Sequence, residues 1–202
     1  MKALLSTYDK TDITEFAHDL SELGYELVST GATQDVISKS GLKVDHVEDL
    51  TGFPQMLGGR VKTLHPNVHG GILARRNLNT DMEELASHQI DPIDLIAVNL
   101  YPFRQTVRNP NVTIEDALEN IDIGGPTMIR AAAKNFPHVI IVVDPKDYSW
   151  ITKKLHDQGN LSLEERKSLA LKAFQHVALY DTAISTYLRK GSQTLFDDEL
   201  TV

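Results

Sequence analysis

The sequence contains no cysteine among its 202 residues. Disulfide bonds and thiolate metal sites are therefore excluded from this chain. It also lacks any run of about 18 apolar residues, the length that a membrane-spanning helix needs, and its first residues show no signal-peptide core. From these absences we expect a soluble, cytoplasmic protein with no membrane partner.

Positive charge is scarce as well. Lys and Arg number 20 against 28 Asp and Glu, which gives a formal net charge of -8 at pH 7. A general nucleic-acid binder would present a basic face, so we expect no nucleic-acid partner. This charge balance does leave room for a local basic pocket that binds a small anion.

Two common kinds of site have no signature here. The sequence has neither a Walker motif nor a G-x-G-x-x-G between a strand and a helix, which disfavours a nucleotide triphosphatase or a dinucleotide enzyme. His65 and His69 are four residues apart, but Pro66 between them argues against a helix that would pair them. A metal site is therefore not favoured.

Short apolar runs alternate with segments of helical periodicity. The predicted strands span residues 2–6, 25–28, 42–47, 95–99 and 138–143. The predicted helices end at about residues 23 and 40, begin at Thr113, and span about 80–88, 126–134, 145–157 and 163–188. This alternation indicates an α/β fold, a mostly parallel sheet with helices on both faces in three layers. We expect one domain over residues 1–190 and a polar tail over 191–202.

The stretch Leu57–Leu73, LGGRVKTLHPNVHGGIL, is the most unusual part of the chain. It has neither strand alternation nor an apolar helical stripe, so it is predicted to be a long shaped loop. Long loops inside compact domains are often functional. Arg60, Lys62 and Thr63 lie close together in it, and such side chains suit an anion, most simply a phosphate.

Polar residues follow three of the predicted strands, at positions where ligands bind in open parallel sheets. Two of these turns, residues 6–10 and 29–33, also begin helices, whose free N–H groups attract anions. Ser and Thr are ordinary helix caps too, but the two turns and the cationic loop together favour a phosphate monoester. The candidate residues here are Ser6, Lys10, Ser29, Thr30, Gly31, Thr33 and Asn99.

A second marked stretch is Glu119–Asn135, ENIDIGGPTMIRAAAKN. Asp122 precedes a Gly-Gly-Pro helix start, so its carboxylate can project into a pocket. Taken singly, the pattern favours a turn or cap residue for Asp122 and a solvated helix end for Lys134. Together with Lys62 and Tyr101, they supply a carboxylate, a phenol and two ammonium groups, which suit proton-transfer chemistry.

Eight segments carry a resemblance to a known family: Asp9–Thr11, Ser29–Gly31, Arg60–Pro66, Val68–Leu73, Asn99–Phe103, Glu119–Asn135, Lys172–His176 and Tyr180–Asp181. They resemble the inosine-monophosphate (IMP) cyclohydrolase domain of the bifunctional purine-biosynthesis enzymes, whose other domain is a folate-dependent formyltransferase. The resemblance covers almost the whole chain, to about Leu188. It implies a methylglyoxal-synthase-like fold, a homodimer, and no metal or organic cofactor.

The activity implied by the resemblance is dehydrative ring closure of the formylated aminoimidazole-carboxamide ribonucleotide (FAICAR) to IMP. By the same resemblance, Lys62 would stabilise the oxyanion, Tyr101 and Asp122 would relay protons, and Lys134 would polarise the carboxamide or assist the departing water. The substrate phosphate would be held by Ser6, Lys10, Ser29, Gly31, Thr33 and Arg60. The candidate binding set is completed by Thr30, Thr63, Asn99, Gly124 and Gly125.

Alternative functions share this fold. A nucleotide-sensing regulatory module would keep the phosphate turns but would not need Lys62, Tyr101, Asp122 and Lys134 together. A methylglyoxal synthase would need a carboxylate base beside a triose phosphate, and its motifs have no match here. No formyltransferase activity is expected, and the tail would be the start of a connection to that domain. The helix predicted over residues 163–188 packs either on a partner chain or within its own chain.

Overall fold

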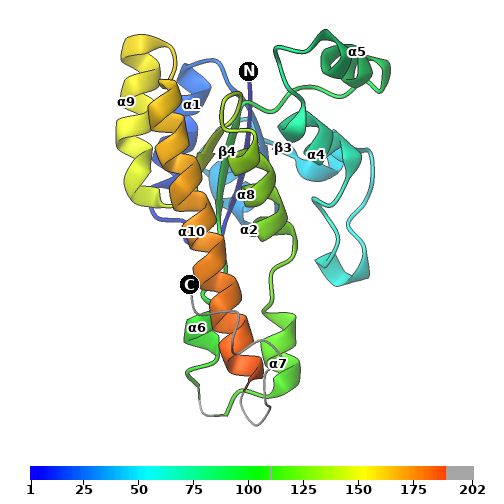
Figure 1. Ribbon diagram of the computed structural model, residues 1–202, viewed down its shortest axis with the longest axis vertical. Coiled ribbons are helices and arrows are strands. Elements are labelled where there is room, and N and C mark those ends of the chain that lie inside the picture. The colour runs from blue at the N-terminus through cyan, green and yellow to red at the C-terminus, as the bar shows by residue number, and fades with distance from the viewer. Residues whose placement is uncertain (110, 190–202) are drawn as a thin grey trace, which may run out of the picture.

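A five-stranded sheet forms the centre of the computed structural model, which describes residues 1–109 and 111–189 (Figure 1). The strands are β1 (Lys2–Thr7), β2 (Glu26–Ser29), β3 (Asp45–His46), β4 (Leu95–Asn99) and β5 (Ile140–Val142). They lie in the order β3-β2-β1-β4-β5, and every neighbouring pair is parallel. The predicted α/β fold with a parallel sheet is confirmed.

The central strands of the sheet are buried on both of their faces. Every residue of β4 is buried, and Leu4 and Ile96, which pair across β1 and β4, are fully covered. A parallel sheet between two helical layers requires apolar side chains on both faces of each strand. This requirement explains why β4 is a continuous apolar run instead of an alternating one.

Helices cover both faces. Helices α1 (Ile13–Glu22) and α2 (Gly31–Lys39) follow β1 and β2, whereas α8 (Gly124–Lys134) connects β4 to β5 in the opposite direction across the sheet. Right-handed crossovers therefore place α8 on the other face. Helix α10 (Leu163–Leu188) packs along α8 and β5, and α9 (Tyr148–Gln158) packs on α1 (Figure 1).

Shorter elements connect these layers: α3 (Val47–Thr51), η1 (Leu57–Gly59), α4 (Pro66–Leu73), α5 (Asn79–Ser87), α6 (Phe103–Thr106), α7 (Ile114–Glu119) and η2 (Pro145–Asp147). The sequence did not predict α3 and α6, which have five and four residues and are too short to show a helical period. The strand predicted over residues 42–47 is reduced to β3. The helix predicted from Pro126 begins earlier, at Gly124.

The prediction that the whole of Leu57–Leu73 is a loop is wrong in its second half, because residues 66–73 form α4. Pro66 does not prevent this helix: it occupies the first helical position, where its missing N–H is not needed. The N-cap is His65, whose Nδ1 accepts from the Asn67 N–H at 3.1 Å. The buried residues of α4 follow helical spacing: Val68, Gly71 and Ile72.

Two further expectations concern the chain outside the sheet. The tail over residues 191–202 lies outside the described residues. Within residues 1–109 and 111–189, no helix combines the length and the apolar character that a bilayer crossing requires.

Candidate active site

The strand order reverses between β1 and β4. Strands β2 and β3 extend the sheet on one side of β1, and β4 and β5 extend it on the other. Ligands of open α/β sheets bind beyond the carboxyl ends of the strands at such a reversal point. The polar segments that follow β1, β2 and β4 therefore meet where the topology predicts a binding site.

The start of α2 forms one wall of this region. The Thr30 hydroxyl lies 2.7 Å from the Ser6 hydroxyl, and Gly31 has a φ of +43°, which favours glycine. Ser29 and Thr33 are committed to the fold, because their hydroxyls donate to the carbonyls of Leu5 (2.6 Å) and Thr7 (2.8 Å). The first N–H groups of α2 lack intrahelical acceptors and can bind an anion.

Lys62 brings a cation to this helix terminus. A Cβ added at Gly31 would lie 3.7 Å from the Lys62 Nζ, and one added at Gly59 would lie 2.8 Å from its Cε. The side chain thus passes over two glycines, and its ammonium group reaches the first residue of α2. Lys62 is half-buried, and the ion pairs of the described residues do not include it. A bound anion would supply the missing counter-charge.

The start of α8 approaches the same connecting segment from the other face of the sheet. Thr63 is buried, and its Oγ1 lies 2.6 Å from the position that a Cβ of Gly124 would take. Gly125 is packed as closely, because a Cβ there would overlap the Asp122 carboxylate. Glycines are therefore required at both positions, and Lys62 and Thr63 connect the N-termini of α2 and α8.

Asp122 precedes α8 and is bonded to its first turn. Its Oδ1 accepts a hydrogen bond from the Gly125 N–H at 3.0 Å. Burial raises the pKa of the Asp122 carboxyl above its ordinary value, although the amides of Gly125 and Gly124 act in the opposite sense. A carboxyl group whose pKa is shifted toward neutrality is suited to exchanging protons with a ligand.

Asn99, at the end of β4, shapes the loop that follows β1. Its Oδ1 accepts from the N–H groups of Tyr8 (2.7 Å) and Asp9 (2.8 Å), and its Nδ2 donates to the Asp9 carbonyl (3.0 Å). Tyr101 packs edge-on against Tyr8, with ring centroids 4.4 Å apart. The Lys10 ammonium group donates to the carbonyls of residues 7 and 8, at 3.2 Å each. This loop and the β4 terminus are thereby joined into one surface.

A cleft of about 890 Å³ extends from this surface toward α10. Lys10 and Asn99 line one side of it, and Lys172 and His176 of α10 line the other. The Lys172 ammonium group pairs with two carboxylates, those of Asp144 and Asp147, at 2.7 Å each. Burial lowers the pKa of His176. The sequence marked Lys172–His176 only through the family resemblance, which assigned no role to these residues.

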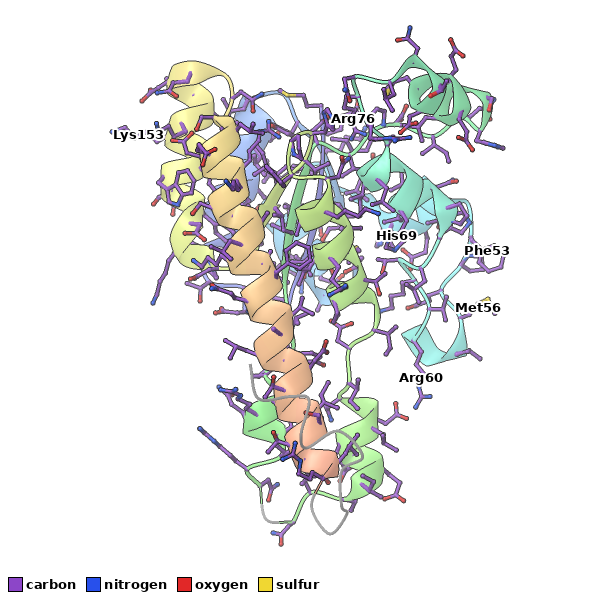
Figure 2. The ribbon with its side chains drawn as sticks, viewed as in Figure 1. Phe53, Met56, Arg60, His69, Arg76 and Lys153 are labelled. Atoms are coloured by element: carbon purple, nitrogen blue, oxygen red, sulfur yellow. The ribbon has the colours of Figure 1, made fainter. Side chains whose placement is uncertain are left out.

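Two of the predicted site residues contact neither the N-terminus of α2 nor Asp122. The Arg60 guanidinium group pairs with the Glu119 carboxylate, and Figure 2 shows its side chain extending away from η1. Lys134 is exposed at the last turn of α8. Ten residues of α8 separate it from Gly124, and at a rise of 1.5 Å per residue this is a distance of about 15 Å along the helix axis. Lys134 thus lies at the end of the helix that is remote from Asp122.

The residues the structure describes contain one cluster with metal-ligand character, outside the candidate site. His18, Asp19 and Glu22 of α1 have ligand atoms within 4.8 Å of one another. His18 and Glu22 are exposed and form an ordinary i,i+4 contact at 3.5 Å. This arrangement needs no ion to explain it.

Two family models match the chain. The MGS-like domain matches residues 12–127, and the AICARFT/IMPCHase bienzyme matches residues 132–202. The bifunctional purine biosynthesis protein PurH of Listeria welshimeri is 50% identical over 200 residues, and that of Leuconostoc mesenteroides is 53% identical over 201 residues. These alignments cover 99% and 100% of this chain, but only 39% of each relative.

A solved structure agrees with these sequence matches. The crystal structure of ForH superposes with a TM-score of 0.87 at 39% sequence identity, covering 96% of this chain and 100% of that chain. The chain thus spans about two fifths of the length of the PurH proteins but all of ForH. With one family model matched over more than half of its length, and relatives about half identical along nearly all of it, the chain belongs to the MGS-like domain family, among sequences of the PurH type.

Proposed function

We propose that this chain is an IMP cyclohydrolase, which closes the ring of FAICAR to give IMP and water. The observation that carries the proposal is the position of the Lys62 ammonium group, which lies over the N-terminus of α2. The next residue, Thr63, contacts the start of α8, where Asp122 is bonded to Gly125. This arrangement combines an anion site with a proton-exchanging carboxyl group. The PurH relatives, named as bifunctional purine biosynthesis proteins, support the same activity.

The substrate phosphate would bind at the N-terminus of α2. The amide groups of Gly31 and its neighbours, the paired hydroxyls of Ser6 and Thr30, and the ammonium group of Lys10 would surround it. Ser29 and Thr33 would contribute by holding β1 against α2, since their hydroxyl protons are already donated to carbonyls.

In the reaction, the carboxamide nitrogen attacks the formyl carbon and forms the new C–N bond. The formyl oxygen then carries the developing negative charge, which the Lys62 ammonium group would stabilise. The carboxamide nitrogen loses one proton and the formamide nitrogen loses the other. The formyl oxygen gains both and leaves as water, and a C=N bond forms between the former formyl carbon and the formamide nitrogen. Tyr101 and Asp122 would relay these protons. An amide nitrogen is a poor nucleophile, so positioning must supply much of the rate enhancement.

Arg60 and Lys134 would need other contacts to take part. Arg60 would exchange its exposed ion pair with Glu119 for the substrate phosphate, and exposed ion pairs contribute little stability. Lys134 stands at the far end of α8 from Asp122, so it would act on a part of the substrate away from this carboxyl group or in the site of a second chain.

The test is ultraviolet-monitored conversion of FAICAR to IMP, without folate or added metal. The variants are Lys62→Ala and Asp122→Asn. The matched control is Lys153→Ala, which removes a cation from the exposed side of α9, far from Arg60 (Figure 2), which precedes Lys62 by two residues. We expect Lys62→Ala to lower kcat by about 10²–10³, the usual loss for one oxyanion-stabilising group, and Lys153→Ala to retain full activity.

A folded wild-type chain that binds nucleotide without converting FAICAR would contradict the proposal and favour the nucleotide-sensing module. Production of methylglyoxal from a triose phosphate would favour the methylglyoxal synthase instead. Equal activity of Lys62→Ala and Lys153→Ala would remove Lys62 from the catalytic set.

We also propose a homodimer in the cytoplasm. Five large apolar side chains of α10 are exposed: Leu163 (57%), Leu171 (59%), Phe174 (39%), Leu179 (57%) and Leu188 (47%). Burying them against a second copy would remove this apolar surface from water. Sedimentation at micromolar concentration should give the mass of two chains, and a monomer would contradict the dimer. Cell fractionation would test the location.

A further inference from the structure

The hydroxyl of Tyr180 is bonded to the turn that carries Asp122. Tyr180 lies on α10, 58 residues after Asp122 in the sequence, and only 7% of its surface is exposed. Its oxygen accepts from the Asp122 N–H at 2.7 Å and its O–H donates to the Asn120 carbonyl at 3.3 Å. One phenol therefore satisfies a donor and an acceptor of the segment between α7 and α8.

The ring of Tyr180 is fixed as firmly as its hydroxyl. It packs edge-on against Phe103 of α6, with ring centroids 6.3 Å apart and planes at 70°. Phe103 is itself fully buried and follows Tyr101 by two residues. Tyr180 thus touches both segments that supply the proposed proton relay, the one that ends at Phe103 and the one that holds Asp122.

We propose that Tyr180 is a positioning residue for Asp122, which sets where the carboxyl group stands relative to the substrate. The inference rests on the proposed function only in naming the reaction that Asp122 serves. Asp122 is attached to α8 through its side chain, which accepts from the Gly125 N–H. Its backbone needs a second attachment, and Tyr180 provides it from a different helix.

Removal of the hydroxyl would act on rate more than on binding. In Tyr180→Phe the ring keeps its packing, but the Asp122 N–H and the Asn120 carbonyl lose their partner. The turn then relaxes, and a displacement of about 1 Å in a catalytic group can cost about 10²-fold in rate. The phosphate contacts at α2 are not touched, so KM should change by less than about threefold while kcat falls about ten- to a hundredfold.

A double-mutant cycle tests whether this effect passes through Asp122. FAICAR cyclisation is measured for wild type, Tyr180→Phe, Asp122→Asn and the double variant. If Tyr180 acts through Asp122, adding Tyr180→Phe to Asp122→Asn causes no further loss. Losses that multiply would overturn the proposal. Tyr25→Phe is the control, because it removes the hydroxyl of a tyrosine that is equally buried (7% exposed) but directly precedes β2, at the amino ends of the strands and away from Asp122; it should retain wild-type kcat.

Amide hydrogen exchange tests the inference without any turnover. In wild type the Asp122 N–H should be protected, and in Tyr180→Phe its exchange should be at least tenfold faster, while Tyr25→Phe leaves it unchanged. Free exchange of this amide in the wild-type protein would overturn the proposal, whether or not Tyr180→Phe folds. If the amide behaves as expected but no cyclisation occurs, the positioning contact stands and the proposed function fails.

Discussion

Adjacent glycines in α4 should respond in opposite ways to the same substitution. Gly70 and Gly71 both lie inside the helix. A Cβ on Gly71 would stand 2.7 Å from the Asp91 carbonyl oxygen and 3.1 Å from Ile93 Cγ1, whereas a Cβ on Gly70 would meet only side chains, at 3.5 Å or more. The Asp91 carbonyl oxygen belongs to the backbone and cannot rotate away, so Gly71→Ala should destabilise the protein. Gly70→Ala should not.

The two substitutions share every term but one. Each replaces glycine by alanine in a helix, which gains about 1 kcal/mol of helix propensity. Gly71→Ala alone adds overpacking, which costs about 1–3 kcal/mol. The difference between the variants is therefore about 2 kcal/mol. For a chain of this length each kcal/mol corresponds to about 2–4 °C in Tm, so Gly71→Ala should melt about 4–8 °C below Gly70→Ala.

Thermal melts followed by circular dichroism at one pH and one protein concentration would measure this difference, and urea melts would give it as a free energy of unfolding. Gly70→Ala should be as stable as wild type or more so. Equal melting temperatures for the two variants would refute the reasoning, since they would show that α4 does not approach the Asp91–Ile93 segment as closely as these distances require.

Three further outcomes can be checked. Gly125→Ala should abolish cyclisation in a folded protein, because its Cβ would displace the Asp122 carboxylate; kinetics and circular dichroism test this. Asp122→Asn should be more stable than wild type at pH 7. Burial raises the pKa of the Asp122 carboxyl, so the wild-type protein loses stability as pH rises through this raised pKa and the carboxyl ionises. Urea melts should show that the difference in the free energy of unfolding between the two proteins vanishes below the ordinary pKa of 3.8. Glu165 has a pKa lowered to about 2 by its bond to Lys154, so the stability that Glu165→Gln loses at pH 7 should shrink as pH falls from 4.5 toward 2 in the same assay.

The sequence predicted best where short-range signals decide the structure. The range of about 163–188 predicted for the last helix agrees with α10. Its start is well defined, because Ser162 and Glu165 bond reciprocally before the first turn, with the Ser162 N–H 2.8 Å from the Glu165 carboxylate. The apolar run of β4 was equally clear. Pro66 misled the prediction because the same residue breaks a helix interior and favours a helix start. Only the burial of Val68 and Ile72 distinguishes the two cases.

For the candidate site, the sequence suggests residues but not their arrangement. The approach of Lys62 to Gly31 follows from the strand order, which local patterns do not contain. The bonds from Asn99, a predicted binding residue, to the loop after β1 join residues about 90 positions apart, so local patterns do not show that its side chain shapes this loop. The remoteness of Lys134 was accessible from sequence, because the predicted helix over residues 126–134 already separates it from Asp122 by its own length.

The central place of β1 has a consequence for synthesis. Translation makes β1 first, yet one of its edges pairs with β4, where Ala3 stands beside Leu95. Until residue 95 leaves the ribosome, that edge offers unpaired backbone groups between apolar side chains, and such edges are prone to aggregation. A nascent chain arrested before β4 should therefore bind chaperones that recognise extended apolar segments, and one arrested after β5 should release them.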